Sequence, residues 1–275
     1  MLNPRLETLS DYPFQRLARL LGTLDPPPGR PPVDLSIGQP MHPIPPLMIE
    51  ALRANEHLWG RYPPVTGSPA FRQAAAAWLT RRYHLPEGLL DPERHVLPVA
   101  GTKEALFLIA QAVTGEQKAG RRPAVLLPNP FYNVYLGGAV MAGAEPVLLP
   151  VSAATGYWPV LDELDPALLD RTAAFYLCSP ANPQGVAADL AYLKRLIELA
   201  RRHDFLLIMD ECYAEIYSGD PPVGALEAAV ALDGRLDSVI VCHSLSKRSS
   251  AAGLRSGFVA GDLDVLAGFT HLRSY

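Results

Sequence analysis

Cysteine is scarce in this chain: the 275 residues contain only three, Cys178, Cys212 and Cys242. Each lies at or just after an apolar run. Three cysteines placed in this way are typical of small buried side chains and not of a disulfide framework. Because disulfides persist mainly in oxidising compartments, this usage favours a reducing one, and we expect a cytoplasmic protein.

Long apolar runs and blocks of like charge are also missing. No run approaches the length of about 20 residues that a membrane-spanning helix needs, and the opening MLNPRLETLSDYPF lacks the basic-then-apolar order of a secretory leader. The chain has 24 basic and 28 acidic residues, a net charge of −4, which argues against a nucleic-acid surface. Its seven histidines are scattered without metal-ligand spacing. We therefore expect no membrane, no nucleic-acid partner and no metal.

Proline, in contrast, is abundant, and it marks the N-terminal region. A short amphipathic segment, FQRLARLLGTL (14–24), is followed by DPPPGRPPVDLSIGQP (25–40). Prolines at this density exclude a helix or a central strand and predict an extended connector. We expect an N-terminal arm and proline-rich connector over residues 1–45, and one large domain over 46–275.

From residue 94 onward, short apolar runs alternate with helical patterns. The runs lack polar alternation, which is typical of strands buried on both faces. Helical patterns lie between most of them, such as TKEALFLIAQAV (102–113) and DLAYLKRLIELARRHD (189–204). This order predicts an α/β fold of three layers, α/β/α, around a mostly parallel seven-stranded sheet. The expected strands are HVLPV (95–99), PAVLLP (123–128), EPVLLPV (145–151), AAFYLC (173–178), FLLIMD (205–210), SVIVC (238–242) and GFVAG (257–261).

Ligands of such sheets bind at the carboxyl ends of the strands, so the residues after each run are the candidates for a site. After the first run, in AGTKEAL (100–106), Gly101 and Thr102 open a helix. Free backbone N–H groups at a helix start can bind an anion; the alternative is an ordinary turn with Thr102 as the N-cap. After the second run, Tyr132 either stacks on an aromatic ligand or is a core aromatic of the next helix.

The next two informative strand ends carry an amide and a carboxylate. SPANPQG (179–185) predicts a tight turn, in which Asn182 either shapes the turn or offers an amide donor to a ligand. Asp210 ends the most hydrophobic run, where a carboxylate is costly unless it is paired or hydrogen-bonded. It either caps a following helix or serves a ligand, and Tyr213, three residues on, could face the same cavity.

The sixth run leads into SLSKRSSAAGLRSG (244–257). Lys247 follows a strand and a serine-rich turn, so we expect it at the carboxyl edge of the sheet, where it suits a Schiff-base nucleophile. Ser244 supplies a hydroxyl and Arg255 a positively charged guanidinium, which together suit a phosphate dianion. Together the strand ends offer an anion site, an aromatic ring, an amide, a carboxylate and a lysine. This set matches the demands of pyridoxal 5′-phosphate.

The same motifs resemble those of the class I/II pyridoxal-phosphate-dependent aminotransferases, which have the aspartate-aminotransferase fold, fold type I. The matching motifs are AGTKEAL (100–106), P-x-Y-x-x-Y (130–135), N-P-x-G (182–185), D-x-x-Y (210–213) and S-x-S-K-x7-R-x-G (244–257). The resemblance implies that Lys247 is the Schiff-base lysine. It also implies that Lys247 is the acid–base that moves a proton between the substrate's α-carbon and the cofactor's C4′.

The resemblance assigns further residues around the cofactor. Asp210 matches the partner of the pyridine nitrogen, and the implied catalytic residues are Lys247, Asp210 and Tyr213. Asn182 and Tyr213 match donors to the phenolate oxygen, and Tyr132 matches the stacking ring. The residues implied at the phosphate are Gly101, Thr102, Lys103, Ser244 and Arg255, with Ser246 as a further cofactor-binding residue.

Two glycine- and tyrosine-containing motifs near the N-terminus resemble substrate and subunit contacts. Gly38 in SIGQP resembles the glycine whose backbone meets the substrate carboxylate. Tyr62 in RYPPVTG resembles a tyrosine that reaches the cofactor phosphate of a neighbouring subunit, which implies a homodimer with shared sites. Together with Asn182, these are the expected substrate-binding residues.

The two ends of the chain carry a closer resemblance. NPRLETLSDYPFQRLARLL (3–21) and HLRSY (271–275) look like the bacterial succinyldiaminopimelate aminotransferases of lysine biosynthesis. That family moves an amino group between N-succinyl-LL-2,6-diaminopimelate and 2-oxoglutarate. The resemblance therefore implies a small-molecule amino donor and a 2-oxo acid acceptor.

In one respect the chain departs from the family. Family members continue past the position of Tyr275 into a C-terminal small domain, which carries the arginine that pairs with the substrate α-carboxylate. No residue after Arg255 fits that role, and Arg273 lies before the missing domain, so we expect a truncated chain.

Four other functions stay open beside the expected one. A β-lyase and other amino-acid aminotransferases share the same cofactor-binding motifs, so these motifs distinguish poorly between the three functions. A non-catalytic ligand-sensing domain, of the kind fused to DNA-binding modules, is disfavoured because no basic helix-turn-helix segment precedes residue 94. The last alternative is a cofactor-binding fragment without turnover.

Overall fold

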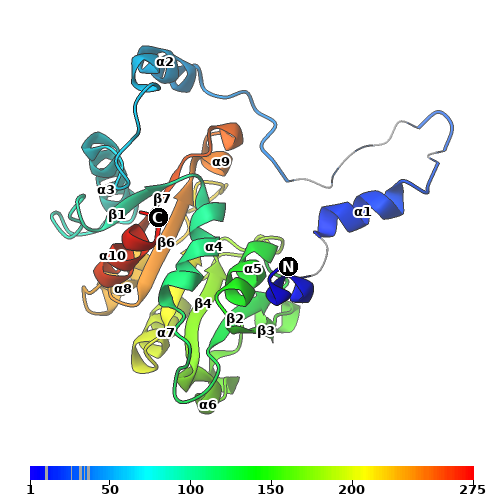
Figure 1. Ribbon diagram of the computed structural model, residues 1–275. Coiled ribbons are helices and arrows are strands. Elements are labelled where there is room, and N and C mark those ends of the chain that lie inside the picture. The colour runs from blue at the N-terminus through cyan, green and yellow to red at the C-terminus, as the bar shows by residue number, and fades with distance from the viewer. Residues whose placement is uncertain (10–11, 26, 31–32, 34, 36–37) are drawn as a thin grey trace.

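The structure, a computed structural model, describes residues 1–9, 12–25, 27–30, 33, 35 and 38–275. Within them, seven strands form one sheet in the order β1–β7–β6–β5–β4–β2–β3 (Figure 1). Each strand falls on one of the predicted apolar runs, so the predicted fold is confirmed. The strands are β1 (Val96–Val99), β2 (Ala124–Asn129), β3 (Glu145–Pro150), β4 (Thr172–Cys178), β5 (Leu206–Asp210), β6 (Val239–Ser244) and β7 (Gly257–Gly261).

Strand β7 runs antiparallel to both of its neighbours, β1 and β6, whereas the other neighbouring strands pair in parallel. Because β7 is reversed, its first residue, Gly257, pairs with the last residues of the two flanking strands, Val99 and Ser244. A side-chain carbon on Gly257 would lie 2.6 Å from the carbonyl oxygen of His243 and 3.5 Å from the Cα of Gly101. Glycine therefore allows the ends of β1 and β6 to approach each other.

Helices cover both faces of the sheet and give the three predicted layers (Figure 1). On one face lie α4 (Thr102–Val113), α5 (Asn133–Met141) and α10 (Leu263–Leu272). On the other lie α3 (Pro69–Arg82), α7 (Leu190–Arg202) and α8 (Ala225–Leu232). Successive strand residues alternate between the two apolar layers: Leu207 packs with the second set of helices and Ile208 with the first. Both faces of the strands inside the sheet are buried, which explains why those strands lack polar alternation.

Helix α7 shows how the sequence sets an element. The Asp189 carboxylate accepts a hydrogen bond of 2.7 Å from the backbone N–H of Tyr192, which caps the first turn. The buried residues that follow recur at helical spacing and form one apolar stripe. They are Leu193, Leu196, Ile197 and Ala200.

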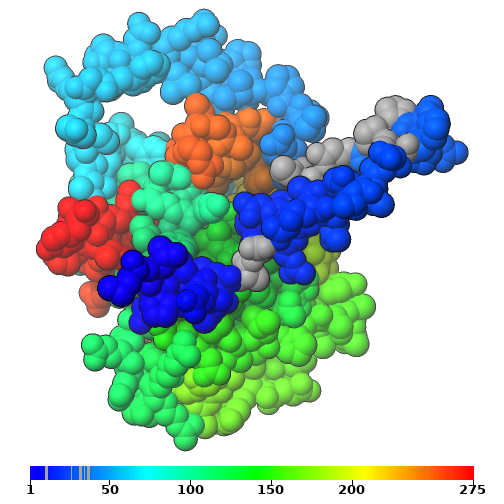
Figure 2. All heavy atoms as spheres, turned by 45° about the vertical axis from the view of Figure 1, so that its right-hand side comes forward, coloured from blue at the N-terminus to red at the C-terminus, as the bar shows by residue number. Residues whose placement is uncertain are grey.

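The N-terminal region contributes no buried side chain from its three main helical segments, η1 (Pro4–Thr8), α1 (Pro13–Leu21) and α2 (Pro46–Ala54). The predicted amphipathic segment forms α1. Arg5 fastens η1 to the body, since its Nη1 donates a hydrogen bond of 2.9 Å to the carbonyl oxygen of Met141 at the end of α5. Figure 2 shows the light-blue residues around α2 arching away from the rest of the molecule.

The other helical segments are short. They are η2 (Glu56–Leu58), η3 (Ala153–Thr155), η4 (Leu161–Glu163), α6 (Pro166–Asp170), α9 (Leu245–Arg248) and η5 (Ala252–Leu254). Among all helices of the described residues, none has the length and apolar character needed to cross a membrane.

Candidate active site

Lys247 lies in α9, in the first turn after β6. Ser244 caps this short helix: its Oγ accepts a hydrogen bond from the N–H of Ser246 (3.1 Å) and donates one to the Ser246 hydroxyl (2.9 Å). The Nζ of Lys247 donates to the carbonyl oxygen of Gly38 (2.7 Å) and lies 5.8 Å from the centre of the Tyr213 ring. Three residues predicted for the site, from three distant parts of the chain, thus meet at the carboxyl edge of the sheet.

Asn182 joins this group from the loop after β4. Its Nδ2 donates a hydrogen bond of 3.2 Å to the hydroxyl oxygen of Tyr213. The predicted turn around it is present: the N–H of Gly185 donates to the carbonyl oxygen of Ala181 at 2.7 Å. Gly185 has a φ of 73°, in the left-handed region that favours glycine. The turn therefore fixes the amide side chain beside the tyrosine hydroxyl.

Asp210, the last residue of β5, is buried, with 4% of its surface exposed. The hydroxyl of Tyr135 donates a hydrogen bond of 2.7 Å to its Oδ2, and the N–H of Cys212 donates one of 3.3 Å to its Oδ1. Burial raises the pKa of Asp210 above its ordinary value, and the hydrogen bond from Tyr135 opposes that rise. The alternative that Asp210 caps a helix is wrong, because the next helix among the described residues, α8, begins at Ala225.

Tyr135 is the residue at this site to which the sequence assigned no role. Its ring is fully buried and stacks on Tyr176, with ring centres 4.6 Å apart and planes 7° apart. Burial raises the pKa of the Tyr135 hydroxyl, so it stays protonated and remains a hydrogen-bond donor to Asp210. A signal was present: Tyr135 is the second tyrosine of P-x-Y-x-x-Y, one helical turn after Tyr132.

The start of α4 forms the predicted anion-binding turn. Gly101, not Thr102, is the N-cap, with a φ of 81°. A side-chain carbon on Gly101 would collide with the guanidinium of Arg255, so the absence of a side chain lets the arginine lie against the turn. Arg255 donates from Nη2 to the carbonyl oxygen of Ala100 (3.3 Å) and from Nη1 to that of Ala252 (2.9 Å). A fixed guanidinium therefore lies beside the free N–H groups of the helix start.

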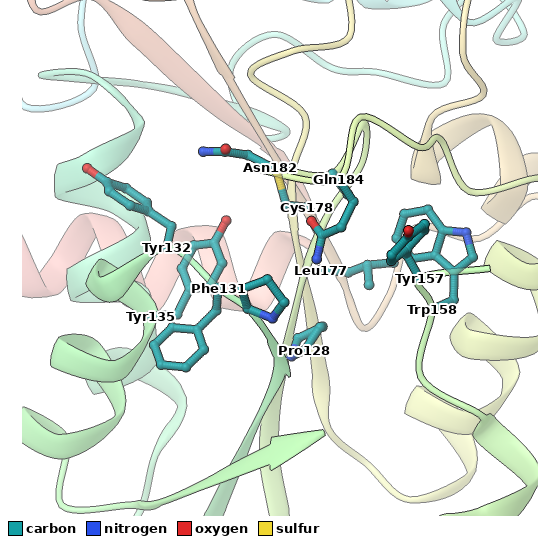
Figure 3. Close-up of a pocket in the computed structure, with 12 residues that line it drawn as sticks. Pro128, Phe131, Tyr132, Tyr135, Tyr157, Trp158, Leu177, Cys178, Asn182 and Gln184 are labelled. Atoms are coloured by element: carbon teal, nitrogen blue, oxygen red, sulfur yellow. The ribbon is translucent and has the colours of Figure 1, made fainter. Parts of the chain in front are cut away.

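Tyr132 is half-buried at the N-cap of α5, where it packs against the border of the apolar layer on that face. Burial, with Tyr12 and Asp210 nearby, raises the pKa of Tyr132 to about 12. Together with Asn182 it borders a hollow at the surface. Figure 3 shows Gln184 directed into this hollow, between Phe131 on one side and the Tyr157–Trp158 pair on the other.

Two predicted residues lie apart from the others. Lys103 is exposed, and its Nζ lies 5.9 Å from the centre of the Tyr12 ring of the N-terminal region. Tyr62 is fully exposed and contributes nothing to the site of its own chain. Within the described residues, no cluster of three or more His, Cys, Asp or Glu side chains is arranged to hold a metal ion.

Residues 30–274 match the family described as aminotransferase class I and II. The chain belongs to this family. It is 37% identical over 243 residues to a probable aminotransferase of Mycobacterium tuberculosis, covering 88% of this chain and 53% of that protein. It is 31% identical over 273 residues to the LL-diaminopimelate aminotransferase of Desulforudis audaxviator, covering 98% of this chain and 66% of the relative.

Solved structures show the same fold. An aminotransferase from Neisseria meningitidis superimposes with a TM-score of 0.93 at 38% identity, covering all of this chain and 69% of that one. A probable N-succinyldiaminopimelate aminotransferase from Thermus thermophilus has a TM-score of 0.78 at 28% identity, covering 94% of this chain and 65% of that one. The chain thus spans between about half and two thirds of the length of these relatives.

Class I and II aminotransferases of this fold use pyridoxal 5′-phosphate, and the residues at this edge of the sheet fit that cofactor. They supply a primary amine, a buried carboxylate, an amide–phenol pair and a half-buried aromatic ring. The glycine turn with its guanidinium supplies cationic and N–H donors suited to a phosphate.

Proposed function

We propose that residues 46–275 form the cofactor-binding domain of a pyridoxal-phosphate-dependent aminotransferase, with residues 1–45 as an arm. The observation that carries the proposal is the convergence of the Lys247 amine, the Asn182–Tyr213 pair and the buried Asp210 carboxylate at one edge of the sheet. Membership of the aminotransferase family supports the same function.

Each side chain has a distinct task in this proposal. When bound, pyridoxal phosphate supplies an aldehyde that condenses with amines and a ring that withdraws electrons from the substrate's α-carbon. The Nζ of Lys247 would hold the cofactor through its aldehyde group, and the same amine would move a proton at the substrate's α-carbon. Asp210 holds a proton at the ring nitrogen. A carboxyl whose pKa is raised by burial binds a shared proton more strongly than an ordinary one.

The remaining residues bind and orient. Asn182 and Tyr213 would donate hydrogen bonds to the phenolate oxygen, and Tyr132 would stack on the ring. The free N–H groups in the first turn of α4 and the Arg255 guanidinium would bind the phosphate, with Ser244 and Ser246 as hydroxyl donors. The carbonyl of Gly38 already accepts a hydrogen bond from the Lys247 amine, so this backbone segment lies where a substrate carboxylate would approach.

For the substrate, we propose N-succinyl-LL-2,6-diaminopimelate as amino donor and 2-oxoglutarate as acceptor. The two ends of the chain and the likeness to the T. thermophilus protein named as a probable N-succinyldiaminopimelate aminotransferase support this choice. A second candidate donor is LL-diaminopimelate, because relatives 30–33% identical are named LL-diaminopimelate aminotransferases. We further propose a homodimer, in which Tyr62 of one subunit reaches the phosphate site of the other; its full exposure leaves it available for that contact.

Absorbance titration tests the cofactor assignment. Pyridoxal phosphate added to the 275-residue chain should produce a visible band, and Lys247→Ala should abolish it because the aldehyde then has no amine to join. Lys194→Ala, on α7 and away from the site, is the matched control and should keep the band. A band that persists in Lys247→Ala would remove Lys247 from its role.

Donors added to the loaded protein then separate the reactions. N-succinyl-LL-2,6-diaminopimelate should bleach the band and 2-oxoglutarate should restore it. Bleaching by LL-diaminopimelate but not by the succinylated donor would favour the second candidate. Pyruvate released from a β-substituted alanine, in the absence of a keto acid, would indicate a β-lyase. An intact band that no donor bleaches would indicate a cofactor-binding fragment without turnover.

A further inference from the structure

The turn between β1 and α4 is held by hydrogen bonds on both sides of a single residue, Ala100. Its carbonyl oxygen accepts the hydrogen bond from Arg255 Nη2 (3.3 Å). Its N–H donates a hydrogen bond of 2.6 Å to the Oε2 of Glu104, in the first turn of α4. The orientation of the peptide next to Gly101 therefore depends on the Glu104 carboxylate as well as on Arg255.

Glu104 is itself held by an arginine from the end of α10. The Nε of Arg273 lies 3.2 Å from Glu104 Oε1, and its Nη1 donates a hydrogen bond of 2.8 Å to the carbonyl oxygen of Pro98 in β1. The guanidinium lies 5.5 Å from the centre of the Phe269 ring, and Phe269 is fully buried. The two charged side chains are only 17% and 28% exposed, so solvent screens the pair less than an ordinary surface salt bridge. Arg273 thus connects α10, β1 and the first turn of α4.

The position of Glu104 raises an electrostatic problem. A carboxylate in the first turn of a helix is favourable for the helix dipole, but the same helix end presents its N–H groups to the proposed phosphate. An unpaired carboxylate there would repel a phosphate dianion. The positive charge of Arg273 cancels it while leaving the hydrogen bond to Ala100 in place.

We propose that Arg273 and Glu104 are positioning residues for the cofactor's phosphate. Glu104 orients the Ala100 peptide of the anion-binding turn, and Arg273 fixes Glu104 and neutralises its charge. The inference rests on the proposed function, because it requires the phosphate to lie at the Gly101–Thr102 end of α4. It also gives Arg273, which does not fit the role of a substrate-carboxylate arginine, a task at the cofactor.

Binding of two ligands that differ only in the phosphate tests the proposal. The dissociation constants of pyridoxal phosphate and of pyridoxal are measured by absorbance for the wild type, Arg273→Met, Arg273→Lys, Glu104→Gln and the Arg273→Met/Glu104→Gln double variant. Arg273→Met should weaken pyridoxal phosphate binding about tenfold, the scale of a hydrogen bond to a charged group, and leave pyridoxal binding unchanged. Arg273→Lys, which keeps the charge, and the double variant, which removes the unpaired carboxylate, should each recover most of the affinity.

The same two dissociation constants provide a control and define the outcomes that would contradict the proposal. Arg195→Met removes an exposed ion pair with Asp162 and should change neither constant. Equal losses for both ligands in Arg273→Met, no loss for pyridoxal phosphate, or a double variant no tighter than Arg273→Met would each overturn the proposal. If the wild type itself shows no preference for pyridoxal phosphate over pyridoxal, the proposed phosphate cup fails, and this inference with it.

Discussion

Asp210 is a carboxylate in a buried position, and its burial has a consequence for stability. The Tyr135 hydroxyl and the Cys212 N–H donate hydrogen bonds to its oxygens, yet burial still raises the pKa of Asp210. The folded protein without cofactor therefore prefers the protonated carboxyl more than the unfolded chain does. A group kept for its chemistry at such a position reduces stability at neutral pH, a common trade-off at functional sites.

Replacing Asp210 by Asn should make this cost visible in the cofactor-free protein. The pKa of Asp210 in the folded protein lies above its value of about 4 in the unfolded chain. The folded wild type is therefore most stable below the unfolded pKa, and it loses that stability as the pH rises through the folded pKa. Relative to the wild type, Asp210→Asn should gain about 2–4 °C in melting temperature at pH 7, the shift that about 1 kcal/mol produces at this size. The gain should vanish near pH 4.

Thermal unfolding between pH 4 and 8 provides the measurement. Asp162→Asn, which changes an exposed carboxylate, is the control and should show no such trend. A melting difference that does not vary with pH would contradict the burial argument for Asp210.

Single residues of the site differ in how well the sequence reveals them. Asp210, Tyr213 and Lys247 closely follow apolar runs, and Asn182 lies in a recognisable turn, so strand positions alone predicted their common edge. Tyr135 was assigned no role, although P-x-Y-x-x-Y marks its position, because its hydrogen-bond partner Asp210 lies 75 positions away in the sequence. The pairing of Glu104 with Arg273 spans 169 positions and depends on how α10 packs on α4.

At the scale of elements, the strands other than β3 were predictable because burial on both faces leaves continuous apolar runs. The edge strand β3 carries such a run too, although Leu149 is its only buried residue. The reversed direction of β7 was not, because an apolar run carries no sign of strand direction. The reversal has a large effect on the site: it brings the residues just before β7, including Arg255, to the same edge as the ends of β1 and β6. Gly257 is the residue of β7 that pairs with the last residues of both β1 and β6.

Gly257→Ala should therefore destabilise the sheet. The added methyl carbon would lie 2.6 Å from a backbone carbonyl oxygen in β6, and neither strand can move without disturbing the pairing on both sides of β7. We expect a loss of about 1–3 kcal/mol in the free energy of unfolding, the range for an overpacked site. Urea denaturation measures it.

The matched control has the opposite sign. Gly268 lies in α10 with nothing within 4 Å of the position of an added side-chain carbon. Gly268→Ala should therefore stabilise the protein by about 0.5–1 kcal/mol, because alanine favours a helix interior over glycine. Equal effects of the two substitutions would show that the close approach at Gly257 is not what limits the sheet.

At the scale of the whole molecule, the N-terminal region carries apolar side chains that the chain itself does not cover. The exposed fractions are 69% for Leu20, 73% for Leu47 and 71% for Trp59, and Tyr62 is fully exposed. Large apolar side chains left exposed along one region of the chain are available to a surface that binds another protein. This exposure supports the proposed homodimer, while the division of the chain at residue 45 stays a prediction.

The dimer makes a concentration-dependent prediction for Tyr62. If its hydroxyl reaches the phosphate site of the other subunit, Tyr62→Phe should weaken pyridoxal phosphate binding about tenfold, the scale of a hydrogen bond to a charged group, but only where the protein is dimeric. Sedimentation velocity identifies concentrations above and below dimer formation, and absorbance titration gives the affinity at each. Tyr275→Phe, another exposed tyrosine, should have no effect at either. A protein that is monomeric throughout, or an equal loss in monomer and dimer, would contradict a shared site, since Tyr62 makes no contact with the site of its own chain from its exposed position.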